Sequence, residues 1–188
     1  MPTFYLVQHG DKQRTPGDPG LTELGRAQAA RTGRWLRHNA ELTACYSSPF
    51  CRARETAEAV AAATSMRVQV DPRLRERMNW DGSRPLAAFL ADWATATGDR
   101  DHVPRDGDSS RRAGDRLRGF LVDHLGLAGG VAVVTHGGVT VDLLRTLVGD
   151  DQLPTRLLTD GVPSCALTVL DGLSVVEIAS VDHLATHD

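Results

Sequence analysis

The sequence predicts an α/β protein, a three-layer sandwich in which helices flank a mostly parallel central sheet. Short apolar runs alternate with alanine-rich or amphipathic segments along the whole chain, which is the pattern of strand–helix–strand units. No linker or internal repeat divides the 188 residues, and this length suits one hydrophobic core. We therefore expect a single domain over residues 1–188.

The first strand and the first helix each have a local signal. Phe4–Val7 is an apolar run that ends just before a histidine. A loop rich in proline and glycine follows, and then a helix is expected over 21–39. Thr22 is suited to cap the first turn of this helix, and Glu23 favours its positive end.

The following segments repeat this alternation, and the last two form a hairpin. In order, we expect a strand at 42–48, a helix opened by Pro49, a strand at 67–70, a loop at 71–84, a helix that begins at Pro85, a polar surface excursion at 98–110, a helix at 111–126, a buried strand that begins at 130, a helix at 139–149, and two strands at 164–172 and 173–181. Asp171-Gly172 is a turn signal for joining those last two strands.

Charge and cysteine content restrict the class of protein. The formal net charge of −3 gives no indication of a nucleic-acid partner. Cys45, Cys51 and Cys165 cannot all pair and form no CxxC motif, so reduced thiols and a cytoplasmic location are expected. No signal-peptide pattern and no apolar run near ~20 residues is present, so we expect no membrane partner.

Two histidines follow apolar strands, and each precedes glycine. His9 and His136 fall where strands end, and ligands of open α/β sheets bind beyond the carboxyl ends of the strands. A histidine there can be a nucleophile, a general base or a metal ligand. Arg52 lies near the start of a helix, where N–H groups and a planar guanidinium suit phosphate. Gly10 and Gly137 would let backbone approach such a ligand closely.

Five blocks in a fixed order resemble one family. They are "QHG" at 8–10, "LTELG" at 21–25, "SSPFCRARETA" at 47–57, Glu76 in "LRERMNW", and "VVTHGG" at 133–138. Each block alone is weak, but their order and combination resemble the histidine phosphatase superfamily, the phosphoglycerate-mutase-like enzymes. The resemblance covers nearly the whole chain and implies the phosphoglycerate-mutase-like version of the predicted sandwich.

The resemblance implies a two-step phosphoryl transfer that needs no metal or other cofactor. His9 would attack phosphorus and become phosphohistidine, and Glu76 would protonate the leaving oxygen and then activate water. Arg52 and His136 would hold the phosphoryl oxygens. A nucleophilic imidazole must be neutral, with its other nitrogen fixed by a carbonyl, whereas His136 would work better protonated.

Three other carboxylates compete with Glu76 for a role. Asp71 and Asp81 lie in the same predicted loop and are alternative proton donors. Asp108 lies where relatives often carry a glutamate near the substrate. A helix cap or loop role is favoured for Asp108, which makes it an auxiliary candidate only.

Gln8 departs from the family pattern, which places an arginine before the nucleophile. An amide donor remains, but a fixed charge is lost, and losing one buried charged contact typically costs ~2–5 kcal/mol. Lys12 or Arg14 could replace the missing cation, the substrate could need less anionic stabilisation, or the site could be weakened to a phosphate-binding role.

The sequence thus predicts a phosphomonoester hydrolase that acts on a small phosphorylated metabolite. The short chain, and the lack of the Asn that mutase-like members carry after their first block, favour hydrolysis over transfer to a sugar acid. A phosphoprotein phosphatase that acts on phosphohistidine and a catalytically weakened phosphate-binding protein are the alternatives. The sequence leaves the oligomeric state open, with a homodimer as one option.

Overall fold

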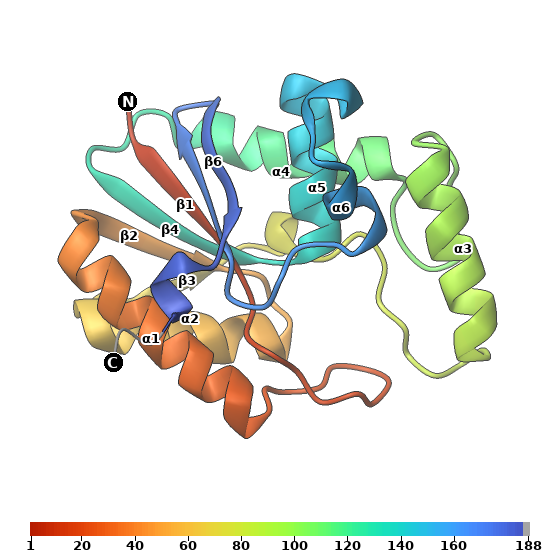
Figure 1. Ribbon diagram of the computed structural model, residues 1–188, viewed down its shortest axis with the longest axis horizontal. Coiled ribbons are helices and arrows are strands. Elements are labelled where there is room, and N and C mark those ends of the chain that lie inside the picture. Colours follow the sequence, from red (N-terminus) through yellow and green to blue (C-terminus); the bar gives the residue numbers. More distant parts are fainter. Residues whose placement is uncertain (186–188) are drawn as a thin grey trace.

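Six strands form one mixed, mostly parallel sheet in the order β3-β2-β4-β1-β5-β6 (Figure 1). The computed structural model describes residues 1–185. The strands are β1 (Thr3–Gln8), β2 (Leu42–Ser47), β3 (Val68–Val70), β4 (Gly130–Thr135), β5 (Leu167–Asp171) and β6 (Ser174–Ser180). The first four pair in parallel, whereas β5 is antiparallel to both β1 and β6. The predicted fold class is confirmed.

Helices cover both faces of this sheet. The α-helices are α1 (Glu23–Asn39), α2 (Cys51–Thr64), α3 (Leu86–Gly98), α4 (Ser110–Asp123), α5 (Gly137–Val148) and α6 (Thr155–Thr159). α1 and α2 lie together on one face, α4 and α5 lie on the other, and α3 stands beyond the sheet (Figure 1). Single 3-10 turns occur at Pro72–Leu74, Asp150–Gln152 and Asp182–Leu184. No helix within residues 1–185 is long and apolar enough to cross a membrane.

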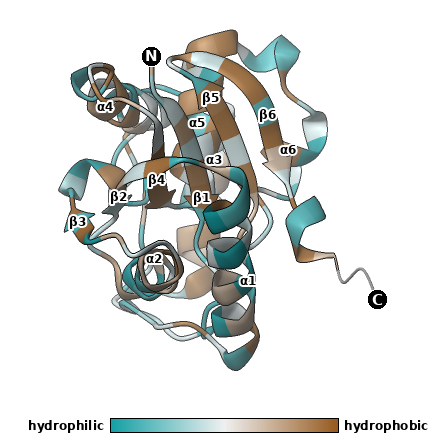
Figure 2. Ribbon diagram, turned by 90° about the vertical axis from the view of Figure 1, so that its left-hand side faces the viewer, coloured by the Kyte–Doolittle hydropathy of each residue, from teal (hydrophilic) through white to brown (hydrophobic). Residues whose placement is uncertain are grey.

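The central strand β4 explains why the sheet is covered on both faces. All six of its residues are buried, and successive side chains of a strand point to opposite faces. Val131 and Val133 pack with α4 and α5, whereas Ala132 and Val134 pack with α1 and α2. The strands are accordingly largely hydrophobic in Figure 2.

Most predicted elements occur within two or three residues of their expected bounds. Thr22 caps α1 by accepting a hydrogen bond from the Gly25 N–H at 3.0 Å, and β5 and β6 form the predicted hairpin around Gly172. α6 was not predicted. The prediction of a surface excursion over 98–110 was wrong in part, because Ser110 is fully buried and its hydroxyl donates to Asp142 at 2.6 Å.

Two glycines bring the loop after β1 against α1. A Cβ at Gly25 would collide with the backbone of Asp11, and a Cβ at Gly10 would collide with the backbone carbonyl of Gly25. Backbone cannot yield as a flexible side chain can. This contact therefore fixes the direction in which the chain leaves β1, next to His9.

We expect Gly25→Ala to lower the free energy of unfolding by ~1–3 kcal/mol, because an added methyl overpacks a backbone contact. Denaturant unfolding measures the loss. The matched control is Gly119→Ala in α4, where a Cβ would meet nothing within 4 Å, and there a helical alanine is expected to stabilise by ~0.5–1 kcal/mol. Equal effects of the two variants would contradict the proposed contact.

Candidate active site

Three strands bring their carboxyl ends to one edge of the sheet. β1 pairs with β4 up to Gln8 and Thr135, and β2 pairs with β4 up to Ser47 and Val134. The residues that follow these strands therefore meet. The rings of His9 and His136 lie edge to face, with 5.2 Å between their centroids.

His9 is held as a neutral imidazole whose Nε2 is unprotonated. Its Nδ1 lies 2.8 Å from the Gly10 carbonyl oxygen, which only accepts, so Nδ1 carries the proton and Nε2 does not. Arg52 Nε donates to that Nε2 at 3.3 Å. Burial and then the charge of Arg52 lower the pKa of His9 to about 3, so the ring is neutral at pH 7.

His136 is completely buried, which its sequence position does not indicate. Its side chain is fully buried, and its Nε2 shares a 2.7 Å hydrogen bond with Ser48 Oγ. Burial, followed by His9 and Arg52, lowers the pKa of His136 well below its usual range. Burial therefore disfavours the protonated form that was expected for His136. Its Nδ1 has no hydrogen-bond partner among residues 1–185.

Arg52 is the second residue of α2 and is only 3% exposed. The guanidinium lies 4.8 Å from the Phe50 ring centroid and donates from Nη2 to Asn79 at 3.2 Å. Its Nη1 has no hydrogen-bond partner in the described part of the chain, and the nearest carboxylate, Asp18, is 3.8 Å away. Sequence reasoning missed Asn79, since a single loop amide belongs to no motif.

Gln8 lies beside the nucleophile candidate, with its Nε2 3.4 Å from Nε2 of His9. Of the two cations expected nearby, Lys12 lines the same cavity as His9 and Arg52, whereas Arg14 is exposed and lies outside that lining. Burial and then the charge of Arg52 lower the pKa of Lys12. Of the two cations, Lys12 is therefore the one that lies in the cavity of His9.

Glu76 is fixed against the start of α5. Its carboxylate accepts hydrogen bonds from the backbone N–H of Gly138 at 3.0 Å and of Val139 at 2.8 Å. The competing carboxylates are occupied elsewhere: Asp71 binds Arg73 at 2.8 Å, and Asp81 accepts from the Ser83 N–H on the surface. Geometry thus favours Glu76 among the three.

Asp108 does not join the site. It pairs with Arg75 at 2.7 Å and with Arg116 at 3.0 Å, and it is absent from the lining of the cavity that contains His9. The N-cap of α4 is its neighbour Ser109. The structure therefore places Asp108 in an ion-pair cluster outside the cavity of His9, and the cap role expected for it falls to Ser109.

The two glycines after the histidines differ from each other. The Gly10 N–H donates to Thr56 Oγ1 at 3.0 Å, and its close approach is to Gly25. Gly10 is therefore not free to bind phosphate through that N–H, which corrects the expectation. Gly137 begins α5 and lines a cavity beside Gln8.

A cavity of about 170 Å³ opens onto His9. Lys12 and Arg52 supply two positive charges against the carboxylate of Glu76, and an aromatic wall of Trp80, Phe89 and Trp93 completes the lining. No cluster of three or more His, Cys, Asp or Glu that could hold a metal ion occurs in residues 1–185, and His187 lies outside that range. Fold and site together define an α/β protein with a neutral imidazole in a cationic cavity.

The chain belongs to the histidine phosphatase superfamily (branch 1), whose family model matches residues 4–173. It is 31% identical over 186 residues to a probable phosphoglycerate mutase, GpmB, of Yersinia pestis, with 91% of this chain and 85% of that protein covered. A mycobacterial glucosyl-3-phosphoglycerate phosphatase is similar in structure (TM-score 0.72, 26% identity, 89% of each chain). YhfR of Bacillus stearothermophilus is also similar (TM-score 0.74, 27% identity, 98% of this chain and 100% of that one).

Proposed function

We propose that this protein is a metal-independent phosphomonoester hydrolase that acts on a small phosphorylated metabolite through a phosphohistidine on His9. The observation that carries the proposal is the Nε2 lone pair of His9, unprotonated and 3.3 Å from Nε of the buried Arg52. A phosphoryl oxygen that takes this donor would bring phosphorus to the lone pair. The free cysteines suit a cytoplasmic location.

In the first step, the Nε2 lone pair of His9 forms a bond to phosphorus, and the bond from phosphorus to the leaving oxygen breaks. Protonated Glu76 gives its proton to that oxygen, so an alcohol departs. Arg52 Nη1 and His136 Nδ1 have no hydrogen-bond partner among residues 1–185 and can donate hydrogen bonds to the phosphoryl oxygens. An anion there would favour the protonated form of His136.

In the second step, water attacks the phosphohistidine. Glu76, now ionised, takes a proton from that water as the N–P bond breaks. Inorganic phosphate leaves, His9 recovers its lone pair, and Glu76 is protonated again. Both steps use side chains of this chain alone.

Hydrolysis rather than mutase activity is proposed, although one relative is named a probable mutase. The test is incubation with 3-phosphoglycerate and with p-nitrophenyl phosphate, with separate assays for inorganic phosphate and for 2-phosphoglycerate. Phosphate release supports the proposal, whereas formation of 2-phosphoglycerate without phosphate release contradicts it.

The small cavity beside Phe89 and Trp93 also favours a metabolite over a phosphorylated protein side chain, which would need a shallow open site.

Gln8 is expected to limit phosphate binding. We predict that Gln8→Arg raises kcat/KM for p-nitrophenyl phosphate by about tenfold or more, because a guanidinium beside His9 would add a charged contact to the phosphoryl group. Steady-state kinetics measures the change. The control Gln8→Met keeps the length without the charge and should not raise kcat/KM. An unchanged or lower kcat/KM of Gln8→Arg would show that Gln8 is not the limiting residue.

A further inference from the structure

A second cavity of about 250 Å³ adjoins the one that holds His9. Glu76 and Trp93 line both cavities, and Gln8 lines only the second. α5, the end of α3 and the segment 157–162 form its walls. The two cavities therefore meet at Glu76, the residue proposed to protonate the leaving oxygen.

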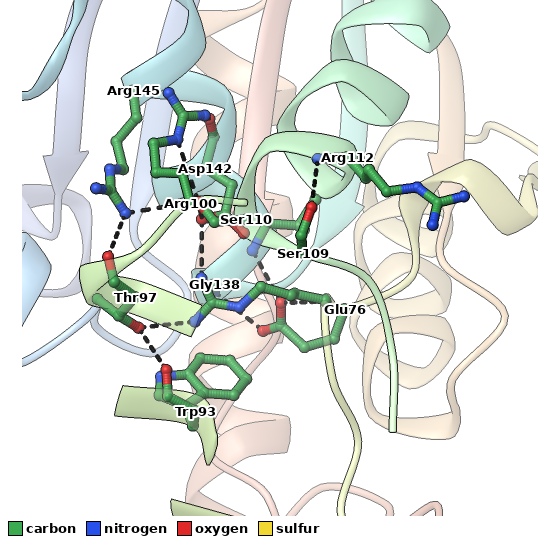
Figure 3. Close-up of polar contacts among 12 residues, drawn as sticks. Glu76, Trp93, Thr97, Arg100, Ser109, Ser110, Arg112, Gly138, Asp142 and Arg145 are labelled. Carbon is green, nitrogen blue, oxygen red and sulfur yellow. Dashed lines mark hydrogen bonds and ion pairs between the residues drawn. The ribbon is translucent and has the colours of Figure 1, made fainter. Parts of the chain in front are cut away.

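A buried ion pair lines this second cavity, whose residues Glu76, Trp93 and Asp142 are labelled in Figure 3. Arg77 Nη1 donates to Asp142 Oδ1 at 2.9 Å, and the Arg77 guanidinium lies 4.2 Å from the Trp93 ring centroid. Arg77 is 3% exposed and Asp142 is fully buried. A buried pair is costly to desolvate and is a poor source of stability, and this one lies in the lining of the cavity.

Three polar atoms of residues that line this cavity lack hydrogen-bond partners within residues 1–185. They are Nε of Arg77, Oδ2 of Asp142 and Oε1 of Gln8. Buried polar groups are rarely left unpaired, because each unmade bond costs ~1–3 kcal/mol. One donor and two acceptors of residues that line the cavity are therefore unpaired within the described part of the chain.

The second cavity lacks the net positive charge of the first. Its lining holds three carboxylates, Glu76, Asp142 and Asp160, against the guanidinium groups of Arg77 and Arg145. Burial raises the pKa of Asp142 to about 6, so this carboxylate is still largely ionised at pH 7. When Glu76 is protonated, as the first step requires, two carboxylates balance the two guanidinium groups, so the cavity offers no net positive charge to a second anionic group on the ligand.

We propose that the second cavity binds the leaving group of the substrate and that this group is an uncharged polyol rather than a carboxylate-bearing alcohol. Hydroxyl groups both donate and accept, so a polyol can satisfy all three unpaired atoms. A carboxylate would only accept and would meet no net positive charge. The aliphatic side chains of Leu158 and Val162 in the lining suit the carbon skeleton, and the volume lies below the ~300 Å³ at which drug-sized sites begin.

This inference rests on the proposed phosphatase function, and its first test compares two substrates that differ at one carbon. sn-Glycerol 3-phosphate carries a terminal hydroxymethyl group where 3-phosphoglycerate carries a carboxylate. We expect kcat/KM at pH 7 to be about tenfold or more higher for sn-glycerol 3-phosphate. Equal values, or a preference for 3-phosphoglycerate, would overturn the inference.

A charge reversal in the wall gives the second test. Asp160 is exposed at the rim of the cavity, so Asp160→Lys should leave the fold intact. We expect it to move the ratio of the two kcat/KM values toward 3-phosphoglycerate by about tenfold. The control Asp171→Lys makes the same charge change on the β5–β6 hairpin, and β1 pairs with β5 so that Asp171 lies at the opposite end of the strand from Gln8.

The outcomes separate this inference from the function on which it rests. If p-nitrophenyl phosphate is hydrolysed but the ratio is the same in Asp160→Lys and Asp171→Lys, the polyol cavity is wrong and the phosphatase stands. If no phosphomonoester is hydrolysed and no phosphohistidine forms, the phosphatase function itself is wrong.

Discussion

His9→Ala should reduce phosphate release from p-nitrophenyl phosphate by about 10³-fold or more and abolish the phosphoenzyme. The variant lacks the only atom proposed to bond to phosphorus, and removal of a nucleophile is among the largest single-residue losses in enzymes. His136 cannot substitute, because it is fully buried and its Nε2 is bonded to Ser48. Steady-state rates, together with trapping of an acid-labile, base-stable phosphoprotein after brief mixing with substrate, measure both effects.

The control for this experiment is His38→Ala, a histidine on the exposed side of α1, which should keep the parent rate. Thermal unfolding of His9→Ala shows whether the fold survives the loss of the hydrogen bond between Nδ1 and the Gly10 carbonyl. A folded His9→Ala protein that still hydrolyses the substrate would exclude the phosphohistidine route. A parent protein that binds phosphate without turnover would indicate the weakened binding protein that Gln8 raises as an alternative.

The sequence predicts the meeting of the two histidines for a definite physical reason. Parallel strands deliver their carboxyl ends to one edge, so residues 127 positions apart converge once both apolar runs are recognised as strands of one sheet. Arg52 follows from the same reasoning, because it lies in the first turn of the helix after β2. Periodicity and strand ends were sufficient for these positions.

Other features depend on tertiary contacts that no local pattern reports. Arg77 and Asp142 pair across 65 residues, and nothing in either segment marks the partner. The neutral state of His136 follows from its complete burial, which depends on Phe50 and on the packing of α5. Gly10 looks like a phosphate-loop glycine in sequence, but its close neighbour is Gly25. α6 has only five residues, which is too short for a 3.6-residue period to be recognised.

Glu76→Gln should lower kcat for p-nitrophenyl phosphate by about 10²–10⁴-fold, the range typical for loss of a general acid–base group. The amide can neither give a proton to the leaving oxygen nor take one from water. One amide oxygen can still accept from the N–H groups at the start of α5, so we expect the variant to remain folded, as thermal unfolding would verify. Glu58→Gln, an exposed carboxylate on α2, is the matched control and should keep the parent rate.

The choice of leaving group distinguishes the proposed role of Glu76 from a merely structural one. Nitrophenolate departs readily without a proton, so the first step is expected to be less impaired than the second, which needs an activated water. Rapid mixing of Glu76→Gln with p-nitrophenyl phosphate should then release about one equivalent of nitrophenol in a burst, and phosphohistidine should accumulate. With sn-glycerol 3-phosphate, whose alkoxide needs protonation, the burst should disappear. A variant that is slow on both substrates with no burst on either would assign Glu76 to holding α5 in place rather than to proton transfer, because a displaced helix would impair both steps alike.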